Sequence, residues 1–389
     1  MARDPHWVGT WTAAPATADG VAFSNQTLRM HPRISLGGRI LRVRLSNAHG
    51  DGPITVGTAH VALRAEGAAI VPASDRVLRF GGEASVTIAA GSLVLSDPVE
   101  LVVPSLADLS VSVYLPGDVP ASLPVTGRYA RQTNYVSPPG DFSATTAMPV
   151  GRIADEWYFL SGIDVVADPG AGGIVTLGDS LTDANISTPD AFCRWPDQLA
   201  RRLAARAGGR PFGVMNQGLG GNRILHDLRG DSGLRRFDRD VLAQPGVKWL
   251  MVLEGINDIG IGNRANAAAS DAVGADDLIA ALKQLIERAH EHGIQAIGGT
   301  LTPYEGAAYY SEAGEQIRTA VNQWIRSSGA FDAVVDFDAA TRNPEHLRSF
   351  REGFNDGDHL HPNDAGYEAM ADAIDLSVFG LKPAATAAR

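Results

Sequence analysis

The sequence predicts two units: an all-β sandwich or jelly roll, followed by an α/β domain whose parallel sheet is covered by helices on both faces. Up to about residue 165, apolar residues alternate in short runs separated by Gly, Pro, Asp and Asn. Beyond residue 173, continuous apolar runs alternate with amphipathic segments. The first pattern is typical of half-buried antiparallel strands, and the second of buried parallel strands between helices. We therefore predict domains at residues 1–168 and 169–389.

The strands of the first unit follow one another with turn residues between them. The runs PITVGTAHVAL and DPVELVV are rich in β-branched residues, which favour strands. Further predicted strands are RILRVRLSN (Arg39–Asn47), ASVTI (Ala84–Ile88), LSVSVYL (Leu109–Leu115) and, as the last of the unit, WYFLSGIDVV (Trp157–Val166). The glycine- and proline-containing stretch VADPGAGG (Val166–Gly173) has the composition of a linker.

Five strands are predicted in the second unit. They are GGIVTLG (Gly172–Gly178), PFGVMNQG (Pro211–Gly218), VKWLMVLEG (Val247–Gly255), IQAIGGTLTP (Ile294–Pro303) and AVVDFD (Ala333–Asp338). Helices are predicted around residues 192–207, 234–243, 275–293, 312–329 and 363–376. In open sheets of this kind, ligands bind beyond the carboxyl ends of the strands, so we expect the functional residues there.

Composition argues against several classes of protein. A formal charge of −11 does not suit a nucleic-acid partner, which needs basic patches. No apolar run reaches the length of about 18 residues that a membrane span requires. The start, MARDPHWVGTW, lacks the apolar stretch of a signal peptide, so we expect a cytoplasmic protein as written; an exported protein whose signal had been removed would look the same. Nothing in the sequence indicates an oligomeric state.

Four strand ends carry polar residues of complementary chemistry. Ser180 follows the first strand, the turn Gly218–Gly221 the second and Asn257 the third, and an Asp/His pair lies in NDGDHLHPNDAGY (Asn355–Tyr367) after the fifth. A nucleophile, oxyanion donors, and a base with an orienting acid are the parts of an acyl-transfer site.

Each of these residues also has a structural interpretation. Ser180 alone could cap its following helix, and Asn257 alone could be a turn residue. Asp258 is expected to be structural, capping the segment after it. His290 and His292 fall at a helix C-terminus, where polar or cationic residues suit the dipole, and we expect them at the surface. We expect no metal site, because no cluster has metal-ligand spacing.

Two other nucleophiles are not expected to act. Gly230-Asp231-Ser232 repeats the Gly-Asp-Ser triplet, but it lies in a polar loop with no strand before it. The single cysteine, Cys193, excludes an intrachain disulfide. Cys193 lies in an amphipathic helical pattern, where we expect a buried structural thiol.

The four separated blocks, in this order, resemble the GDSL or SGNH hydrolase family over roughly Gly172–Phe379. The resemblance implies a flavodoxin-like three-layer α/β/α domain with a five-stranded parallel sheet. It also implies esterase, lipase, thioesterase or carbohydrate deacetylase activity without a metal or organic cofactor. The β-rich unit, with HWVGTWTAAP near its start, is similar to one multidomain branch of the family.

The resemblance also implies roles for individual residues. Ser180 matches the nucleophile. Gly221, just before Asn222, matches the second-block glycine, and Asn257 matches the third-block asparagine. The backbone N–H groups of Ser180 and Gly221 and the amide of Asn257 would form the oxyanion hole.

The last block contains two overlapping frames, Asp356 with His359 and Asp358 with His361. The family's histidine is commonly followed by proline and a helix start, which selects His361 and hence Asp358. The residues after it favour the same frame, because Pro362 is compatible with the first turn of a helix that Asn363 or Asp364 caps. We expect Asp356 and His359 to be loop or rim residues.

The predicted function is therefore a serine esterase acting on a small-molecule or carbohydrate ester, with short acyl chains from acetyl to butyryl. A carbohydrate O-deacetylase or an acyltransferase would use the same triad. A carbohydrate-binding protein with an inert hydrolase domain is the non-enzymatic alternative. Exposed tryptophans on one face of the β-rich unit would favour a role for that unit in binding a polymer.

Overall fold

The computed structural model describes residues 5–16, 21–120, 126–206, 211–264 and 266–381. The outer ends of the two predicted domains, residues 1–4 and 382–389, lie outside these ranges. Ala207, the predicted end of one helix, lies outside them as well.

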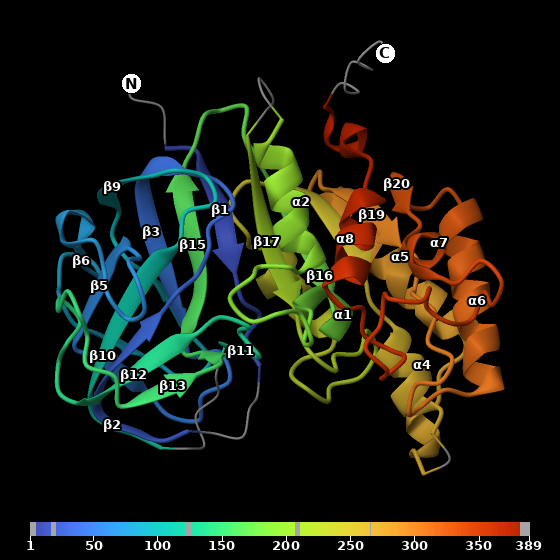
Figure 1. Cartoon of the computed structure of the whole chain (residues 1–389), viewed down its shortest axis with the longest axis horizontal. Helices are drawn as coiled ribbons and strands as arrows, with labels where there is room; N and C mark the ends of the chain where they lie inside the picture. Colours follow the sequence, from blue (N-terminus) through green and yellow to red (C-terminus); the bar gives the residue numbers. More distant parts are fainter. Residues whose placement is uncertain (1–4, 17–20, 121–125, 207–210, 265, 382–389) are drawn as a thin grey trace.

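The β-rich half consists mainly of two antiparallel sheets that share one buried apolar core, as the sequence predicts (Figure 1). One sheet has the order β1-β15-β3-β8, with β9 also paired to β3, and the other has the order β13-β12-β2-β10-β5-β6. Two short pairs, β4 with β7 and β11 with β14, complete it. The strands are β1 Trp7–Thr12, β2 Phe23–Met30, β3 Gly38–Ser46, β4 Ile54–Val56, β5 Thr58–Leu63, β6 Arg76–Leu78, β7 Val86–Ile88, β8 Leu93–Leu95, β9 Val99–Val103, β10 Leu109–Val119, β11 Thr126–Arg128, β12 Asn134–Pro139, β13 Arg152–Ala154, β14 Glu156–Trp157 and β15 Leu160–Val166.

The second half contains the predicted five-stranded parallel sheet. Its strands are β16 Gly172–Gly178, β17 Phe212–Gly218, β18 Val247–Leu253, β19 Gln295–Gly299 and β20 Ala333–Val335. They lie in the order β17-β16-β18-β19-β20, so the second strand of the unit stands at the edge and the first lies inside it. This is the flavodoxin-like order, and it confirms the α/β fold class.

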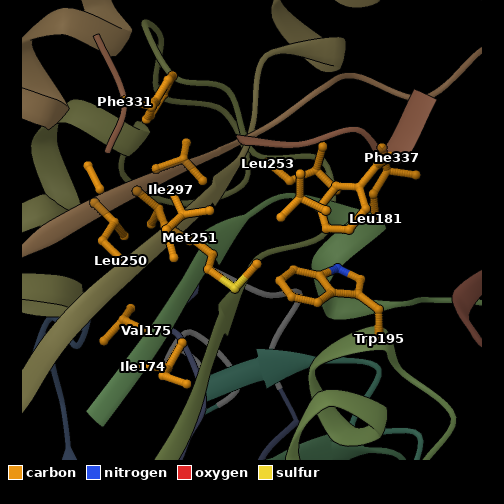
Figure 2. Close-up of a cluster of buried hydrophobic side chains, with 14 of the residues drawn as sticks. Ile174, Val175, Leu181, Trp195, Leu250, Met251, Leu253, Ile297, Phe331 and Phe337 are labelled. Atoms are coloured by element: carbon orange, nitrogen blue, oxygen red, sulfur yellow. The ribbon is translucent and has the colours of Figure 1, made fainter. Parts of the chain in front are cut away.

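Helices cover both faces of the parallel sheet (Figure 1). Helices α2, α7 and α8 contact one another on one side, and α3, α4, α5 and α6 form the other layer. Their bounds are α1 Ser180–Asp183, α2 Trp195–Ala204, α3 Gly233–Phe237, α4 Ile256–Gly262, α5 Ala275–Glu291, α6 Glu312–Ser327, α7 Phe337–Thr341 and α8 Asp364–Asp372. Single turns lie at Pro72–Ser74, Asp238–Leu242, Ala269–Asp271 and Leu376–Phe379. Figure 2 shows strand residues such as Ile174 and Met251 packed with Trp195 and Phe337 in the core between the layers.

Some local predictions differ from the structure. The helix predicted from Phe192 begins only at Trp195, because Pro196 occupies its first turn and the chain before it is extended at Arg194. Cys193 therefore lies before α2 and not within it. The segment predicted as one helix at residues 234–243 is α3 followed by a wider π-helical turn, Asp238–Leu242.

The two halves meet where β1 packs against the edge strand β17 (Figure 1). The Gly9 N–H donates to the Pro245 carbonyl at 3.0 Å. A Cβ at Gly213 would stand 2.0 Å from the Gly9 carbonyl oxygen, so only glycine permits this approach. The predicted boundary between residues 168 and 169 falls in the connection from β15 to β16 and stays a prediction.

Replacing Gly213 with alanine should weaken this junction. The added methyl meets backbone, which cannot move aside as a side chain can, and overpacking of this kind costs about 1–3 kcal/mol of unfolding free energy. We expect a lower Tm in thermal unfolding for Gly213→Ala. Gly170→Ala is the matched control, because a Cβ at Gly170 meets nothing within 4 Å. Equal Tm values for the two variants would contradict this account of the junction.

Candidate active site

Ser180 stands at the carboxyl end of the inner strand β16, as the first residue of α1. Asp179 caps this short helix, its Oδ1 accepting the Leu181 N–H at 2.9 Å. The serine side chain is therefore not the cap, which removes the structural interpretation of Ser180. Ser180 is 4% exposed, so its hydroxyl sits in a largely desolvated position at the sheet edge.

The Ser180 hydroxyl is hydrogen-bonded to a histidine that lies far away in the sequence. The distance from Ser180 Oγ to His361 Nε2 is 2.8 Å, and His361 Nδ1 lies 2.6 Å from Asp358 Oδ2. Burial raises the pKa of the Asp358 carboxyl, but hydrogen bonds from His361, from the backbone at Leu360 and from Asn355 outweigh it and hold that pKa well below its ordinary value. Asp358 thus stays charged beside the imidazole. A hydroxyl, an imidazole and a carboxylate in this chain can perform nucleophilic catalysis with a general base.

The loop that carries His361 is held by side-chain bonds to its own backbone. Asn355 Nδ2 donates to Asp358 Oδ1 at 2.8 Å and to the His361 carbonyl at 2.6 Å. Helix α8 begins directly afterwards, with Asn363 as its cap accepting the Gly366 N–H at 3.1 Å. Pro362 lies one residue before this cap and not in the first turn of the helix, so that detail of the prediction is wrong.

The other Asp/His pair of this loop, Asp356 with His359, makes different contacts. Asp356 Oδ1 accepts from Asn363 Nδ2 at 2.7 Å, so it helps to hold the cap of α8. His359 has a left-handed backbone with φ of 58°. Its ring lies against Gly306, where a Cβ would stand 2.8 Å from His359 Cγ. The structure thus brings Asp358 and His361 to Ser180 and leaves Asp356 and His359 in the loop.

Three N–H groups stand at the ends of three strands, and one of them belongs to Ser180 itself. Gly221 has a φ of 77°, which glycine adopts without strain. Among the described residues, no acceptor takes the backbone N–H of Ser180 or of Gly221. Asn257 Nδ2 uses one hydrogen on the Asn222 carbonyl at 3.0 Å, and its second hydrogen has no acceptor within the described part of the chain. Groups of this kind can hold an oxyanion.

Asp258 connects the two loops that carry these donors. Its Oδ2 accepts the Ile224 N–H at 2.7 Å and its Oδ1 the Leu225 N–H at 3.1 Å. Burial raises the pKa of Asp258, while the two amides lower it. Asp258 is structural, as predicted, but it braces the loop after β17 from within α4 and does not cap the segment that follows it.

A fully buried arginine, Arg236, lies beneath the site. Its guanidinium donates to the Gly178 carbonyl at 2.9 Å, to the Gln217 carbonyl at 2.7 Å and to Asn222 Oδ1 at 2.9 Å. It also lies 3.5 Å from Glu254 Oε2. Arg236 therefore joins the ends of β16, β17 and β18, from which the three donors project.

Two buried carboxyls share the space around that guanidinium. Burial raises the pKa of Asp179 to about 7, although the Leu181 N–H and His361 lower it. Burial and the neighbouring Asp179 raise the pKa of Glu254 well above its ordinary value. Two neighbouring carboxyls that repel one another in this way do not both ionise readily. Asp179 and Glu254 together therefore carry less negative charge than two ionised carboxylates would.

The remaining candidates lie elsewhere. Ser232 precedes α3, and its N–H donates to Asp227 Oδ1 at 2.7 Å. Burial, together with Asp364, raises the pKa of the half-buried Cys193 thiol, which disfavours the reactive thiolate. His290 bonds to Asp332, and His292 bonds to the Arg288 carbonyl. Both histidines precede β19, so they lie at the amino ends of the strands, whereas Ser180 lies at the carboxyl ends.

No group of three or more His, Cys, Asp or Glu side chains in the described ranges could hold a metal ion. No helix within those ranges combines the length and apolar character that crossing a bilayer requires.

The β-rich half supports the loop that follows Ser180. Arg131 Nε donates to the Ser187 carbonyl at 2.7 Å, and the Thr133 N–H donates to Asp190 Oδ1 at 2.7 Å. The three tryptophans of this half, Trp7, Trp11 and Trp157, are half-buried or buried. The exposed tryptophan face that would favour polymer binding is therefore not found.

Sequence reasoning missed Arg236, which bonds to residues next to the site, and Tyr309, which contacts Asn257. Tyr309 donates its hydroxyl hydrogen to Asn257 Oδ1 at 3.2 Å. Arg236 lies in a segment predicted as a helix, and Tyr309 lies in the segment that follows a predicted strand. No periodic signal distinguishes a buried arginine or a loop tyrosine from its neighbours, so only the tertiary contact identifies them.

Solved structures from several bacteria are similar to part of this chain. An acetylxylan esterase from Geobacillus stearothermophilus is 23% identical, with 54% of this chain and 95% of that chain covered and a TM-score of 0.42. A GDSL-like lipase from Bacteroides thetaiotaomicron VPI-5482 is 16% identical, with 54% and 88% covered and a TM-score of 0.41. A lipolytic protein of the G-D-S-L family from Desulfitobacterium hafniense DCB-2 is 22% identical, with 52% and 96% covered and a TM-score of 0.39. No curated protein matches the chain.

A family model gives the decisive comparison. The model described as GDSL-like lipase/acylhydrolase matches residues 174–374, which is more than half of the 389 residues. The matched span contains Ser180, Asn257 and the Asp358–His361 loop. The chain therefore belongs to the GDSL-like lipase/acylhydrolase family and is a carboxylic ester hydrolase.

Proposed function

We propose that this hydrolase is a serine esterase that cleaves esters of short acyl chains through an acyl-enzyme on Ser180. The observation that carries the proposal is the continuous hydrogen-bonded chain from Ser180 Oγ to His361 Nε2 at 2.8 Å and from His361 Nδ1 to Asp358 at 2.6 Å. The substrate is a small-molecule or carbohydrate ester, and the residues named require neither metal nor organic cofactor.

The proposed reaction has two halves. His361 takes the hydroxyl proton as Ser180 Oγ attacks the ester carbonyl carbon, and Asp358 stabilises the imidazolium that forms. The C–O bond to the alcohol then breaks as His361 returns the proton to the leaving oxygen. Water, activated by the same histidine, attacks the acyl-enzyme and releases the acid and free Ser180.

The tetrahedral oxyanion of each half accepts hydrogen bonds from the N–H groups of Ser180 and Gly221 and from the Asn257 amide. This assignment is supported by the free hydrogens on all three groups within the described chain. Donors fixed before the reaction stabilise the developing charge without reorganising. Asp358, whose pKa lies well below its ordinary value, remains available to the imidazolium across the neutral range.

Short acyl chains are proposed because an aromatic side chain lies beside Asn257. The Tyr309 hydroxyl bonds to the Asn257 amide at 3.2 Å. The Tyr309 ring packs on the backbone of α4, 2.2 Å from where a Cβ at Gly260 would stand. An ester carbonyl held by Asn257 would therefore have a fixed aromatic group close to its acyl chain, which favours small groups.

Ser180→Ala should abolish ester hydrolysis with the fold intact, because the hydroxyl is the attacking group. Turnover of a short-chain chromogenic ester measures the loss, and circular dichroism checks the fold. Ser232→Ala and Cys193→Ala are the controls and should keep activity near that of the unaltered protein. Retained activity in Ser180→Ala, or its loss in either control, would exclude Ser180 as the nucleophile.

Substitutions in the two Asp/His pairs of this loop should have opposite effects on activity. His361→Ala should reduce turnover nearly to the level of Ser180→Ala, since a nucleophile without its base is almost as poor as none. Asp358→Asn should also be severe, because an amide cannot stabilise the imidazolium.

The alternative frame supplies matched controls for this test. His359→Ala and Asp356→Asn should keep kcat within about tenfold, or roughly 1.4 kcal/mol of barrier. The four purified variants are compared on one short-chain ester after a circular dichroism check. An inactive His359→Ala beside an active His361→Ala would show that His359, and not His361, is the base.

A substrate panel tests the proposed acyl specificity. Chromogenic esters from acetyl to palmitoyl, set beside acetylated oligosaccharides, should give the highest kcat/KM between acetyl and butyryl. The physical reason is the Tyr309 ring, which lies beside Asn257. A maximum at the palmitoyl ester would contradict the short-chain proposal and leave the triad assignment untouched.

A further inference from the structure

We propose that Tyr309 is a positioning residue, whose hydroxyl holds the Asn257 side-chain amide with its free N–H turned toward the substrate oxyanion. This inference rests on the proposed role of Asn257 as an oxyanion donor. The Tyr309 hydroxyl reaches the reacting atoms only through Asn257, and the ring beside the site is kept in a Tyr309→Phe variant. Loss of this hydroxyl therefore affects the transition state and hardly affects substrate binding.

The two contacts of Asn257 define one orientation of its amide. Tyr309 donates to Oδ1 at 3.2 Å, and Nδ2 donates to the Asn222 carbonyl at 3.0 Å. A flipped amide would turn its oxygen toward the Asn222 carbonyl, which is itself only an acceptor. With the oxygen and one hydrogen occupied, the second hydrogen on Nδ2 has a fixed direction.

The Tyr309 hydroxyl keeps its proton for this bond. Burial, with Asp179 as the next cause, raises the pKa of Tyr309 well above its ordinary value. The group is therefore a neutral donor at any pH at which an esterase is assayed. Asn257 Oδ1 is the acceptor that the structure gives it.

The Tyr309 ring has little freedom to move. It lies directly on α4, where a Cβ at Gly260 would stand 2.2 Å from Tyr309 Cδ2, so a glycine is needed beneath the ring. The Arg264 guanidinium lies 5.5 Å from the ring centroid, and the centroid of the Tyr304 ring lies 6.1 Å from it. The hydroxyl is thus aimed at the second residue of α4, which is Asn257.

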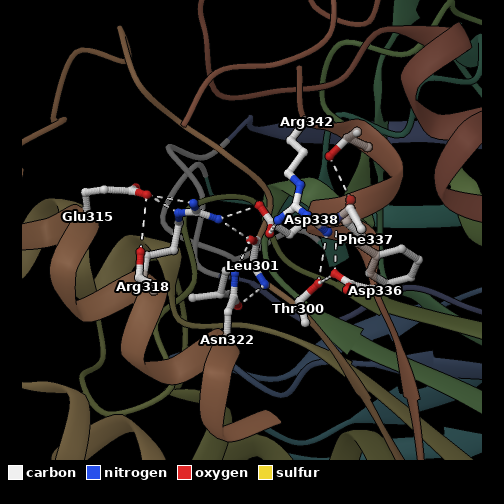
Figure 3. Close-up of polar contacts among 12 residues, drawn as sticks. Thr300, Leu301, Glu315, Arg318, Asn322, Asp336, Phe337, Asp338 and Arg342 are labelled. Atoms are coloured by element: carbon white, nitrogen blue, oxygen red, sulfur yellow. Dashed lines mark hydrogen bonds and ion pairs between the residues drawn. The ribbon is translucent and has the colours of Figure 1, made fainter. Parts of the chain in front are cut away.

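Both ends of the loop that carries Tyr309 are anchored. Figure 3 shows the first anchor, where Asn322 bonds to the backbone N–H and carbonyl of Leu301 at 2.7 and 2.8 Å and Arg318 donates to the same carbonyl at 2.9 Å. At the other end, Ser311 caps α6 by accepting the Gly314 N–H at 3.0 Å. The loop between them therefore presents Tyr309 in a defined place.

The adjacent tyrosine supplies a matched control. Tyr310 donates its hydroxyl hydrogen to Glu312 Oε1 at 3.2 Å, and among the described residues it forms no hydrogen bond with Asn257. Tyr310→Phe removes the same atom one position along the chain. It tests whether the loss of any hydroxyl from this loop has an effect.

Steady-state kinetics on a short-chain ester test the inference with four variants: Tyr309→Phe, Tyr310→Phe, Asn257→Ala and the double variant Tyr309→Phe/Asn257→Ala. Tyr309→Phe should lower kcat roughly 3- to 10-fold, the effect of one neutral hydrogen bond, and change KM less than about twofold. Tyr310→Phe should match the unaltered protein. Asn257→Ala should lower kcat about 10²–10³-fold.

The double variant tests whether the Tyr309 hydroxyl affects kcat through Asn257. If the hydroxyl acts through Asn257, its removal in the Asn257→Ala background should change kcat by less than about twofold. An equal loss in both backgrounds, or a Tyr309→Phe variant with unaltered kcat, overturns the inference while Asn257 keeps its role. Unaltered turnover in Asn257→Ala would instead contradict the oxyanion assignment itself, and with it this inference.

Discussion

The buried guanidinium of Arg236 holds together the strand ends on which the site is built. It bonds to the carbonyls of Gly178 and Gln217 and to the side chain of Asn222, and it lies beside Glu254. A charge this deep is stable only when its partners are complete, and removing one member of such a group typically costs about 3–5 kcal/mol. The same contacts set the distance between the ends of β16, β17 and β18. The N–H groups of Ser180 and Gly221 and the Asn257 amide project from those ends, so their separation depends on this arginine.

Other contacts hold the remaining backbone segments of the site in place. Asp258 ties the loop after β17 to α4, and Asn355 shapes the turn that presents His361 to Ser180. The β-rich half packs along β17 through Gly9 and Gly213 and bonds to the loop after α1. None of these contacts involves the reacting atoms. Each restricts a backbone that carries one of them, which is how a site gathered from four separate segments keeps hydrogen-bond distances between its groups.

Much of this arrangement could be predicted from the sequence because its signals are local. Gly172–Gly178 was predicted as a strand and is β16 residue for residue, since a buried parallel strand is a continuous apolar run. The helix α4 could not be predicted, because INDIGIG has two glycines and no amphipathic period. Its stability comes from tertiary bonds such as that of Asp258. The contact of Tyr309 with Asn257 spans 52 positions, and Arg236 is one of several arginines in its segment. Burial and pairing across such distances leave no local pattern.

We propose that three strand ends present one oxyanion site around Ser180. A crystal structure of the protein after reaction with a phosphonate ester tests it most directly, because the bound phosphoryl oxygen mimics the tetrahedral oxyanion. We expect phosphorus bonded to Ser180 Oγ, with that oxygen about 2.7–3.1 Å from the nitrogens of the Ser180 and Gly221 N–H groups and from Asn257 Nδ2. Phosphorus on another residue, or an oxygen turned away from these donors, would contradict it.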